Sequence, residues 1–284
     1  MTDARAAHLI TPAELEARLR TGAPTSVIDV RWRLDLPDGR GEYRAGHIPG
    51  AVYADMDTQL SEHGEPADGR HPLPSRARLQ AALVAWGVND GDEIVVVDDH
   101  GGVAAARLWW LLRWAGLTRV RVLDGALAAW RDAGFEVETG EVIPAPGTAV
   151  IASLGHLPTV DGDGVAALAE RGVLIDARAA ARYRGDHEPM DPIGGHIPGA
   201  VNVPIDGTVD ATGRYLPSEE LRARFAAVGV VDGVEVGVYC GSGVSAATNV
   251  LALALAGHRA ALYPGSWSSW SNTPGRPVAT GPEP

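Results

Sequence analysis

Cys240 is the residue best suited to nucleophilic chemistry, and it is the only cysteine among 284 residues. It follows the run Val234–Tyr239, which is rich in β-branched residues and predicts a buried strand. An apolar stretch from Ala246 to about Ala256 predicts a helix beyond it, with Gly257 as its stop. The turn between strand and helix consists of small residues, namely Gly241, Ser242, Gly243, Val244 and Ser245.

A turn of this composition favours a reactive thiolate at Cys240. Small residues allow successive backbone N–H groups to point into the loop and form a site for an anion. The helix that follows adds the positive end of its dipole. Both effects favour the thiolate over the thiol, and the thiolate is the nucleophilic form. The alternative is a buried structural cysteine, but a lone cysteine in a turn rich in glycine and serine favours the catalytic role.

The composition excludes several other classes of function. A single cysteine rules out an intramolecular disulfide and a cysteine-rich metal cage, and a chain without lysine cannot form a Schiff base. The net charge of −12 argues against a nucleic-acid partner, which needs a basic patch. The first residues lack the apolar core of a signal peptide, and the apolar stretch Val250–Ala256 is too short to span a bilayer. We therefore expect a cytoplasmic protein with no membrane partner, no metal and no cofactor.

The chain contains one sequence pattern twice. The segment Gly46–Val52 reads Gly-His-Ile-Pro-Gly-Ala-Val, and Gly195–Val201 repeats it identically. Three further pairs match in the same order, namely Val27–Arg31 with Leu174–Arg178, Leu73–Ser75 with Leu216–Ser218, and Gly125–Trp130 with Gly265–Trp270. Two copies of more than 100 residues each indicate a duplicated domain, not a solenoid.

Each copy alternates short strands with helices. Thr11, Pro12 and Glu14 predict a helix start, with a capping residue, a proline in the first turn and a glutamate that closes the capping box. The run Ile94–Val97 predicts a strand. Alternation of this kind predicts an α/β fold in which a parallel sheet is flanked by helices. We expect domains at residues 1–140 and 159–284, joined by a proline- and glycine-rich linker at 141–158.

The two copies differ at the position of the cysteine. Alignment of Gly102-Val103 with Gly243-Val244 places Asp99 opposite Cys240. A carboxylate cannot serve as a thiol nucleophile. The first domain is therefore expected to be non-catalytic.

The run Cys-Gly-Ser-Gly-Val-Ser-Ala at 240–246 resembles the active-site loop of the rhodanese-like sulfurtransferases, and the repeated Gly-His-Ile-Pro-Gly-Ala resembles that family's other signature. The resemblance extends from about Val27 to Trp270 and implies two tandem rhodanese-like domains, of which only the second is catalytic. It also implies that Cys240 takes a sulfane sulfur, becomes a persulfide and passes the sulfur on in a ping-pong reaction. The acceptors implied are cyanide, a thiol or thioredoxin. Related phosphatases need an arginine six residues after the cysteine. This chain has Ala246 at that position, so the loop does not fit a phosphatase.

The resemblance also suggests how the sulfur donor is bound. Family members that prefer 3-mercaptopyruvate typically read Cys-Gly-Ser-Gly-Val-Thr, whereas those that prefer thiosulfate place arginine and lysine after the cysteine. Ser242 matches the first pattern, and Arg182 matches the family arginine that holds the donor's carboxylate or sulfonate. A second arginine of the mercaptopyruvate branch is replaced by Met190. Arg184 is the candidate for compensating this loss.

A serine–histidine–aspartate proton relay is a further implication of the resemblance. Its histidine corresponds to His71 and its aspartate to Asp57. The repeated motif also places a histidine in both copies, as His47 and His196. Because the first copy has no cysteine, this repetition predicts a role in the fold.

Two alternatives stay open, namely a thiosulfate-specific sulfurtransferase and a persulfide carrier or redox-sensing module without turnover of its own.

Overall fold

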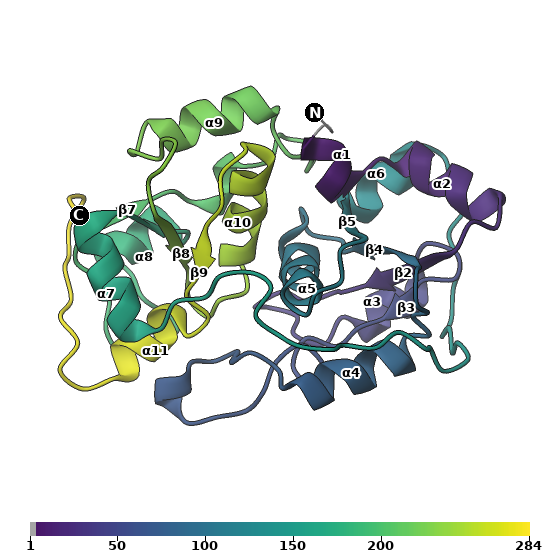
Figure 1. The fold of residues 1–284 in the computed structure, drawn as a ribbon, viewed down its shortest axis with the longest axis horizontal. Coiled ribbons are helices and arrows are strands. Elements are labelled where there is room, and N and C mark those ends of the chain that lie inside the picture. Colours follow the sequence, from purple (N-terminus) through teal and green to yellow (C-terminus); the bar gives the residue numbers. More distant parts are fainter. Residues whose placement is uncertain (1–3) are drawn as a thin grey trace. The chain divides into compact units, whose positions relative to one another are not determined.

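The structure, a computed structural model, describes residues 4–284 as two compact units (Figure 1). Unit 1 consists of the chain up to Glu62, Pro74–His156 and Val209–Tyr215, and unit 2 consists of His63–Leu73, Leu157–Thr208 and Leu216–Pro284. The predicted contiguous domains at 1–140 and 159–284 differ from these units because two short segments are exchanged. Most of the predicted linker, up to His156, belongs to unit 1.

Both exchanged segments end at the repeated Leu-Pro-Ser motif, the first at Leu73 and the second at Tyr215, so the exchange occurs at nearly the same place in both copies. In unit 2, the backbone N–H of Arg70 donates to Ser268 Oγ at 3.1 Å, and the hydroxyl of Ser269 donates to the carbonyl of Ala67 at 2.6 Å. In unit 1, the backbone N–H of Tyr215 donates to Asp124 Oδ1 at 2.9 Å. The first copy of the repeat therefore contributes residues 63–73 to unit 2.

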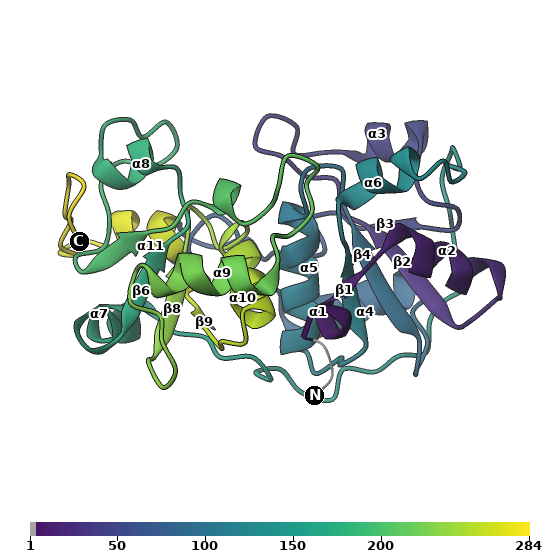
Figure 2. The same ribbon diagram turned by 90° about the horizontal axis from the view of Figure 1, so that it is seen from above.

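Within its described residues, unit 1 contains a five-stranded parallel sheet with the order β1-β5-β4-β2-β3. Its strands are β1 (Leu9–Ile10), β2 (Thr25–Asp29), β3 (Val52–Tyr53), β4 (Glu93–Val97) and β5 (Val120–Leu123). Its helices are α1 (Ala4–His8), α2 (Pro12–Arg20), α3 (Arg40–Ala45), α4 (Arg76–Ala85), α5 (Val103–Trp114) and α6 (Ala126–Asp132). Helices lie on both sides of the sheet (Figures 1 and 2).

Local sequence accounts for where these elements begin and which way they face. The predicted start of α2 is confirmed, since Glu14 N–H donates to Thr11 Oγ1 at 3.2 Å and Thr11 N–H donates to the Glu14 carboxylate at 2.8 Å. The predicted strand Ile94–Val97 lies within β4. Val95 and Val97 pack in one buried cluster with side chains of α2 and α6. Strand alternation turns Ile94 and Val96 to the opposite face, where α5 packs against β4.

Unit 2 contains a four-stranded parallel sheet with the order β7-β6-β8-β9. Its strands are β6 (Val173–Asp176), β7 (Ala200–Asn202), β8 (Val236–Tyr239) and β9 (Ala261–Leu262). Its helices are α7 (Gly162–Arg171), α8 (Ala180–Arg184), α9 (Ser218–Ala226), α10 (Ala246–Leu255) and α11 (Ser266–Asn272), with the 3-10 turns η1 (Pro66–Asp68) and η2 (Ile205–Gly207). The predicted α/β class, with a parallel sheet flanked by helices in each domain, is confirmed.

The repeated histidines serve the fold in both units, as predicted. His47 stacks on Tyr43 with ring centroids 4.1 Å apart, and His196 stacks on Tyr183 at 3.8 Å. Each histidine also places its Nδ1 atom 2.9 Å from the carbonyl of the same tyrosine. Both imidazoles are fully buried.

A buried ion pair is repeated in the same way. Arg31 binds Asp29 in unit 1 at 2.8 Å, and Arg178 binds Asp176 in unit 2 at 2.6 Å. Each arginine also donates to the carbonyl of the glycine that precedes the repeated histidine, at 2.7 Å and 2.6 Å respectively. These pairs connect the end of a central strand to the Gly-His-Ile-Pro-Gly segment, which explains why both patterns recur together.

The segment predicted to be a linker forms no helix or strand, yet it is bound to α4. The backbone N–H of Ile151 donates to Gln80 Oε1 at 2.7 Å, and Gln80 Nε2 donates to the carbonyl of Ala149 at 2.8 Å. Ile151 itself is fully buried. This stretch is therefore an ordered part of unit 1.

Candidate active site

Cys240 follows β8 directly, at the carboxyl edge of the unit 2 sheet, and it is 1% exposed. Its backbone N–H donates to Ser266 Oγ at 3.1 Å, and its carbonyl accepts from Trp267 N–H at 2.9 Å. Ser266 has a φ of +53°, a left-handed conformation that costs a non-glycine residue about 1–3 kcal/mol. Ala126, at the same place in unit 1, shares it with a φ of +57°. The start of α11 therefore contacts the cysteine through a strained residue, and the same strained conformation is repeated in unit 1.

The loop after Cys240 directs a backbone N–H at the sulfur. Gly243 N–H donates to Cys240 Sγ at 3.1 Å. Gly243 has a φ of +79°, and a Cβ atom there would lie 2.4 Å from the carbonyl oxygen of Pro264, so only glycine fits. The predicted helix is confirmed as α10, and its predicted stop Gly257 has a φ of +88°. An N–H aimed at sulfur stabilises negative charge on a thiolate or a persulfide.

Strand register identifies the counterpart of Cys240 in unit 1. The residue before Cys240 pairs with Asp176, and the equivalent Asp29 pairs with the residue before Asp98. Asp98, and not Asp99, therefore occupies the cysteine position, and the predicted assignment of Asp99 is wrong. The physical reason is that the unit 1 loop is one residue longer between the strand and the Gly-Val pair. An alignment made on that pair is consequently shifted by one residue.

The Asp98 carboxylate fills the loop of unit 1. It is 1% exposed and accepts hydrogen bonds of 2.9–3.2 Å from the backbone N–H groups of His100, Gly102, Ala104 and Ala105. Burial raises the pKa of Asp98, and these N–H groups oppose that rise. Asp99 points elsewhere and binds Arg33 at 3.1 Å. Unit 1 therefore shows that this strand–turn–helix loop can enclose an acidic side chain with converging N–H groups.

The structure brings two of the predicted relay residues together. His71 Nδ1 lies 2.8 Å from Ser242 Oγ, although 171 residues separate them in the chain. The exchanged segment 63–73 carries His71 into unit 2, where η1 packs against α11. Asp57 lies in unit 1, and its backbone N–H donates to Asp55 at 3.1 Å. Its place in the relay stays a prediction.

Arg182, on α8, lies beside the cysteine loop. Its Nε and Nη2 atoms donate to the two carboxylate oxygens of Glu188 at 3.0 and 2.7 Å, and Nη2 also donates to Asp191 at 3.2 Å. A Cβ atom on Gly241 would lie 3.3 Å from Arg182 Nη1. The remaining guanidinium nitrogen thus faces the loop, where an anionic donor would meet Cys240.

Arg184 is placed differently. It lies two residues further along α8, and residues with this spacing do not share a helix face. Its guanidinium binds Asp186 at 2.7 Å, and its side chain is 39% exposed. This geometry does not support the predicted donor contact. Met190 is also exposed and offers no charge.

Arg70 also lies beside the loop, and it was not predicted from the sequence. A Cβ atom on Gly241 would lie 3.0 Å from Arg70 Nη2, and Arg70 Nη1 forms an ion pair with the buried Asp191. The sequence did contain a feature that could have indicated Arg70, because Arg70 directly precedes the predicted relay residue His71. Two guanidinium groups from distant parts of the chain therefore converge on the residue that follows Cys240.

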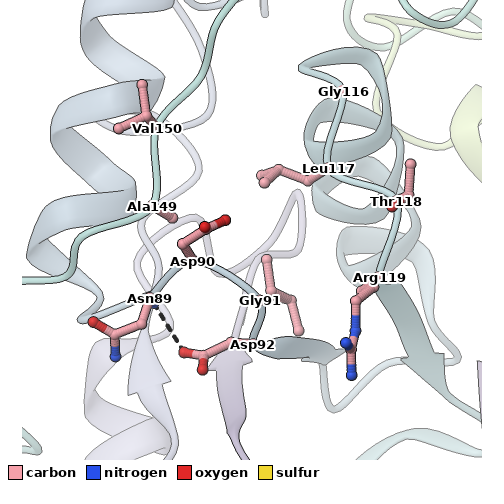
Figure 3. Close-up of a pocket in the computed structure, with 11 residues that line it drawn as sticks. Asn89, Asp90, Gly91, Asp92, Gly116, Leu117, Thr118, Arg119, Ala149 and Val150 are labelled. Carbon is pink, nitrogen blue, oxygen red and sulfur yellow. Dashed lines mark hydrogen bonds between the residues drawn. The ribbon is translucent and has the colours of Figure 1, made fainter.

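A hollow of about 260 Å³ lies in unit 1, away from the Cys240 loop (Figure 3). The turns Asn89–Asp92 and Gly116–Arg119 border it, and they precede β4 and β5. The Asp92 carboxylate is already bound by the backbone N–H of Asn89 at 2.9 Å and by the hydroxyl of Ser26 at 2.8 Å. Ligands in open α/β sheets bind at the carboxyl ends of strands, which is the opposite edge. The Cys240 loop is the better candidate.

The profile of the rhodanese-like domain matches residues 11–133 and 163–273. The chain belongs to the rhodanese-like family. A Mycobacterium tuberculosis protein named for thiosulfate sulfurtransferase activity, SseB, is 46% identical over 98% of this chain and 99% of its own length. A Pseudomonas aeruginosa protein named for 3-mercaptopyruvate sulfurtransferase activity is 44% identical over 97% and 99%. The crystal structure of SseA from Escherichia coli, described as a 3-mercaptopyruvate sulfotransferase, superposes with a TM-score of 0.81 at 33% identity, covering 91% of this chain and 98% of that one.

These relatives confirm the tandem rhodanese-like fold and the enzyme class, a sulfurtransferase of the 3-mercaptopyruvate/thiosulfate type. Rhodanese-like relatives named for either donor are about equally similar to this chain, so similarity alone does not decide between the donors. Within residues 4–284, no helix combines the length and the apolar character needed to cross a membrane.

Proposed function

We propose that Cys240 is the nucleophile of this sulfurtransferase and that 3-mercaptopyruvate is its sulfur donor. The observation that carries the donor assignment is the 2.8 Å contact between His71 Nδ1 and Ser242 Oγ, two residues from the cysteine. A proton relay is useful to a donor whose leaving group must be protonated, and pyruvate enolate is such a group. Thiosulfate leaves as sulfite and needs no proton. Thiosulfate is the second candidate, because two guanidinium groups beside the loop also suit a dianion.

In the first half-reaction, the Cys240 thiolate attacks the sulfur of 3-mercaptopyruvate. A sulfur–sulfur bond forms, the carbon–sulfur bond breaks, and its electron pair leaves with the pyruvate enolate. Ser242 and His71 take the proton of the donor thiol and return it to the enolate carbon, which yields pyruvate. The N–H of Gly243 stabilises the negative charge on Cys240 Sγ before the attack.

In the second half-reaction, a thiophilic acceptor attacks the outer sulfur of the persulfide. The sulfur–sulfur bond breaks, the acceptor keeps the sulfur, and the Cys240 thiolate is restored. Cyanide, a small thiol and thioredoxin all meet this requirement, and we propose thioredoxin as one acceptor. We also propose that the protein is cytoplasmic. A persulfide carrier would complete only the loading step.

The kinetics test the proposal directly. Because the persulfide divides the reaction into two halves, initial rates at several concentrations of 3-mercaptopyruvate and of a thiol acceptor should give parallel double-reciprocal lines. Mass spectrometry after addition of donor alone should show one added sulfur on the peptide that contains Cys240. Intersecting lines with an unmodified peptide would contradict the covalent mechanism. One stoichiometric release of pyruvate without turnover would favour the carrier.

The relay predicts a donor-dependent effect of Ser242→Ala. We expect kcat/KM for 3-mercaptopyruvate to fall by about a hundredfold, and kcat/KM for thiosulfate to change much less, because only the first leaving group needs a proton. His71→Asn should have a similar effect, and the double variant should lose little more, since groups that act as a unit are not additive. Equal losses for both donors, or additive losses in the double variant, would contradict the relay.

A further inference from the structure

We propose that one loop of unit 2 is the surface on which a protein acceptor docks to take the sulfur from Cys240. The loop, called the insertion below, consists of the nine residues 185–193, which the first copy of the repeat lacks. The partner that fits it is a protein whose nucleophilic thiol lies in an uncharged, apolar surface. This inference rests on the proposed function, because it concerns the second half-reaction.

The two copies differ in length between a pair of residues that both units share. In unit 1, Tyr43 lies four residues before His47 and stacks on it. In unit 2, the equivalent Tyr183 lies 13 residues before His196 and makes the same contact. The additional residues occur only in the copy that contains the cysteine. They are therefore not needed for the fold that the two units share.

The polarity of residues 188–193 is the reverse of that of an ordinary surface loop. The side chains of Glu188 and Asp191 are only 4% and 1% exposed. Met190 and Ile193, by contrast, are 45% and 46% exposed. Charged side chains normally face water, and they are almost never buried unless they are paired. An apolar face that is held outward beside buried carboxylates indicates a surface that a partner covers.

Ion pairs and backbone hydrogen bonds hold the insertion in this orientation. Glu188 accepts from Arg182 Nη2 at 2.7 Å, and it also accepts from the backbone N–H groups of Met190 and Asp191 at 3.0 and 3.2 Å. Asp191 in turn forms ion pairs with Arg182 and Arg70. The carboxylates are thus fixed inward and the apolar side chains are left outward. A surface that is ordered before its partner arrives loses little entropy on binding.

The insertion is connected to the cysteine through Trp267. The indole Nε1 of Trp267 donates to the carbonyl of Ile193 at 2.9 Å, and its backbone N–H donates to the carbonyl of Cys240 at 2.9 Å. The apolar face is therefore one tryptophan side chain away from the residue that holds the sulfur. Because Cys240 is 1% exposed, a protein thiol must be held closely against this part of unit 2 to reach it. Cyanide and small thiols need no such surface.

The charges of the insertion indicate the kind of partner. All three of its carboxylates are ion-paired, since Asp186 binds Arg184 at 2.7 Å and the other two bind Arg182. The outer face thus offers apolar area and few charged groups for a partner to pair with. The centres of protein interfaces have the same character, because they are depleted of charged residues. A protein with an uncharged, apolar surface around its reactive thiol matches this face.

The test compares a protein dithiol with a small dithiol as acceptors for the same persulfide. A thiolate of reduced thioredoxin or of dithiothreitol attacks the outer sulfur, and the Cys240 thiolate leaves. The second thiol of the acceptor then displaces hydrosulfide and closes a disulfide, so hydrosulfide release measures both acceptors. We expect Met190→Ser combined with Ile193→Ser to raise KM for thioredoxin about ten- to a hundredfold and to leave kcat unchanged, as for loss of uniform binding. With dithiothreitol, kcat/KM should change less than about twofold.

Two matched variants accompany the double serine variant. Val231 is an equally apolar residue of unit 2, 53% exposed and outside the insertion, so Val231→Ser should leave both acceptors unchanged. Met190→Leu combined with Ile193→Leu keeps the apolar area and should retain KM for thioredoxin. Recovery by leucine separates docking from a defect in folding, because both substitutions alter the same two positions.

A binding measurement separates this inference from the proposed reaction. Calorimetric titration of the Cys240→Ser protein with reduced thioredoxin reports docking without sulfur transfer, and the two serine substitutions should weaken it at least about tenfold. Equal losses with both acceptors, an unchanged KM for thioredoxin, or no transfer to thioredoxin by the unmodified protein would overturn the inference. So would self-association that the double serine variant abolishes, because a second copy would then cover the face. Absence of a Cys240 persulfide, with thioredoxin binding intact, would overturn the proposed function instead.

Discussion

Replacing Cys240 with serine is expected to lower kcat/KM for sulfur transfer by at least about a thousandfold, because a hydroxyl cannot form a persulfide. The fold should be kept, since the serine oxygen can accept the same N–H of Gly243 that the sulfur accepts. Pyruvate release from 3-mercaptopyruvate and sulfite release from thiosulfate measure the loss. Both should disappear together, because the same thiolate attacks either donor.

The control for this experiment is Ser245→Ala, which changes a residue of the same loop and leaves the thiol in place. Circular dichroism and the thermal midpoint should match those of the unmodified protein for both variants. Retention of a tenth of the original turnover by Cys240→Ser would end the cysteine mechanism. Loss of activity accompanied by unfolding would instead assign the cysteine a structural role.

Replacing Asp98 with alanine is expected to lower the free energy of unfolding by about 3 kcal/mol, which is a large effect for one substitution. The carboxylate accepts four backbone N–H groups at the start of α5, and alanine would leave these donors buried without a partner. Urea unfolding followed by tryptophan fluorescence measures the change, because Trp109 and Trp110 lie on that helix. The transition midpoint should fall while the slope stays the same.

Asp99→Ala is the matched control and also tests the position of the cysteine counterpart. Asp99 is partly exposed and pairs with Arg33, so its loss should cost less than about 1 kcal/mol. If Asp99→Ala destabilised the protein more than Asp98→Ala, the strand register would give the wrong counterpart. A similar small cost for both would mean that the unit 1 loop does not depend on a buried carboxylate.

Local features were predictable because neighbouring residues decide them. The capping box at Thr11, the glycine stop at Gly257 and the small-residue turn after Cys240 each involve residues a few positions apart. The repeat was also readable, because duplicated packing needs duplicated side chains. His47 with His196, and Arg31 with Arg178, keep the same buried contacts in both units.

The cysteine counterpart was not predictable from local pattern. The Gly-Val pair at 102–103 suggested Asp99, because it is the nearest motif shared with the second copy. Pairing between β2 and β4 sets the register instead, and it places Asp98 after the strand. A one-residue difference in loop length leaves no trace in composition. Only the hydrogen-bonded ladder of the sheet reveals it.

By itself, the sequence determined the class of chemistry, the tandem fold and the nucleophile candidate, because a lone cysteine in a glycine- and serine-rich turn is a local signature. The tertiary structure decided which charges surround that cysteine. Residues 63–73 leave the first unit and carry Arg70 and His71 to the loop of the second. Composition and periodicity describe how residues relate to their neighbours along the chain. Contacts between residues more than 150 positions apart depend on how the sheets and helices pack, and they exist only in the folded protein.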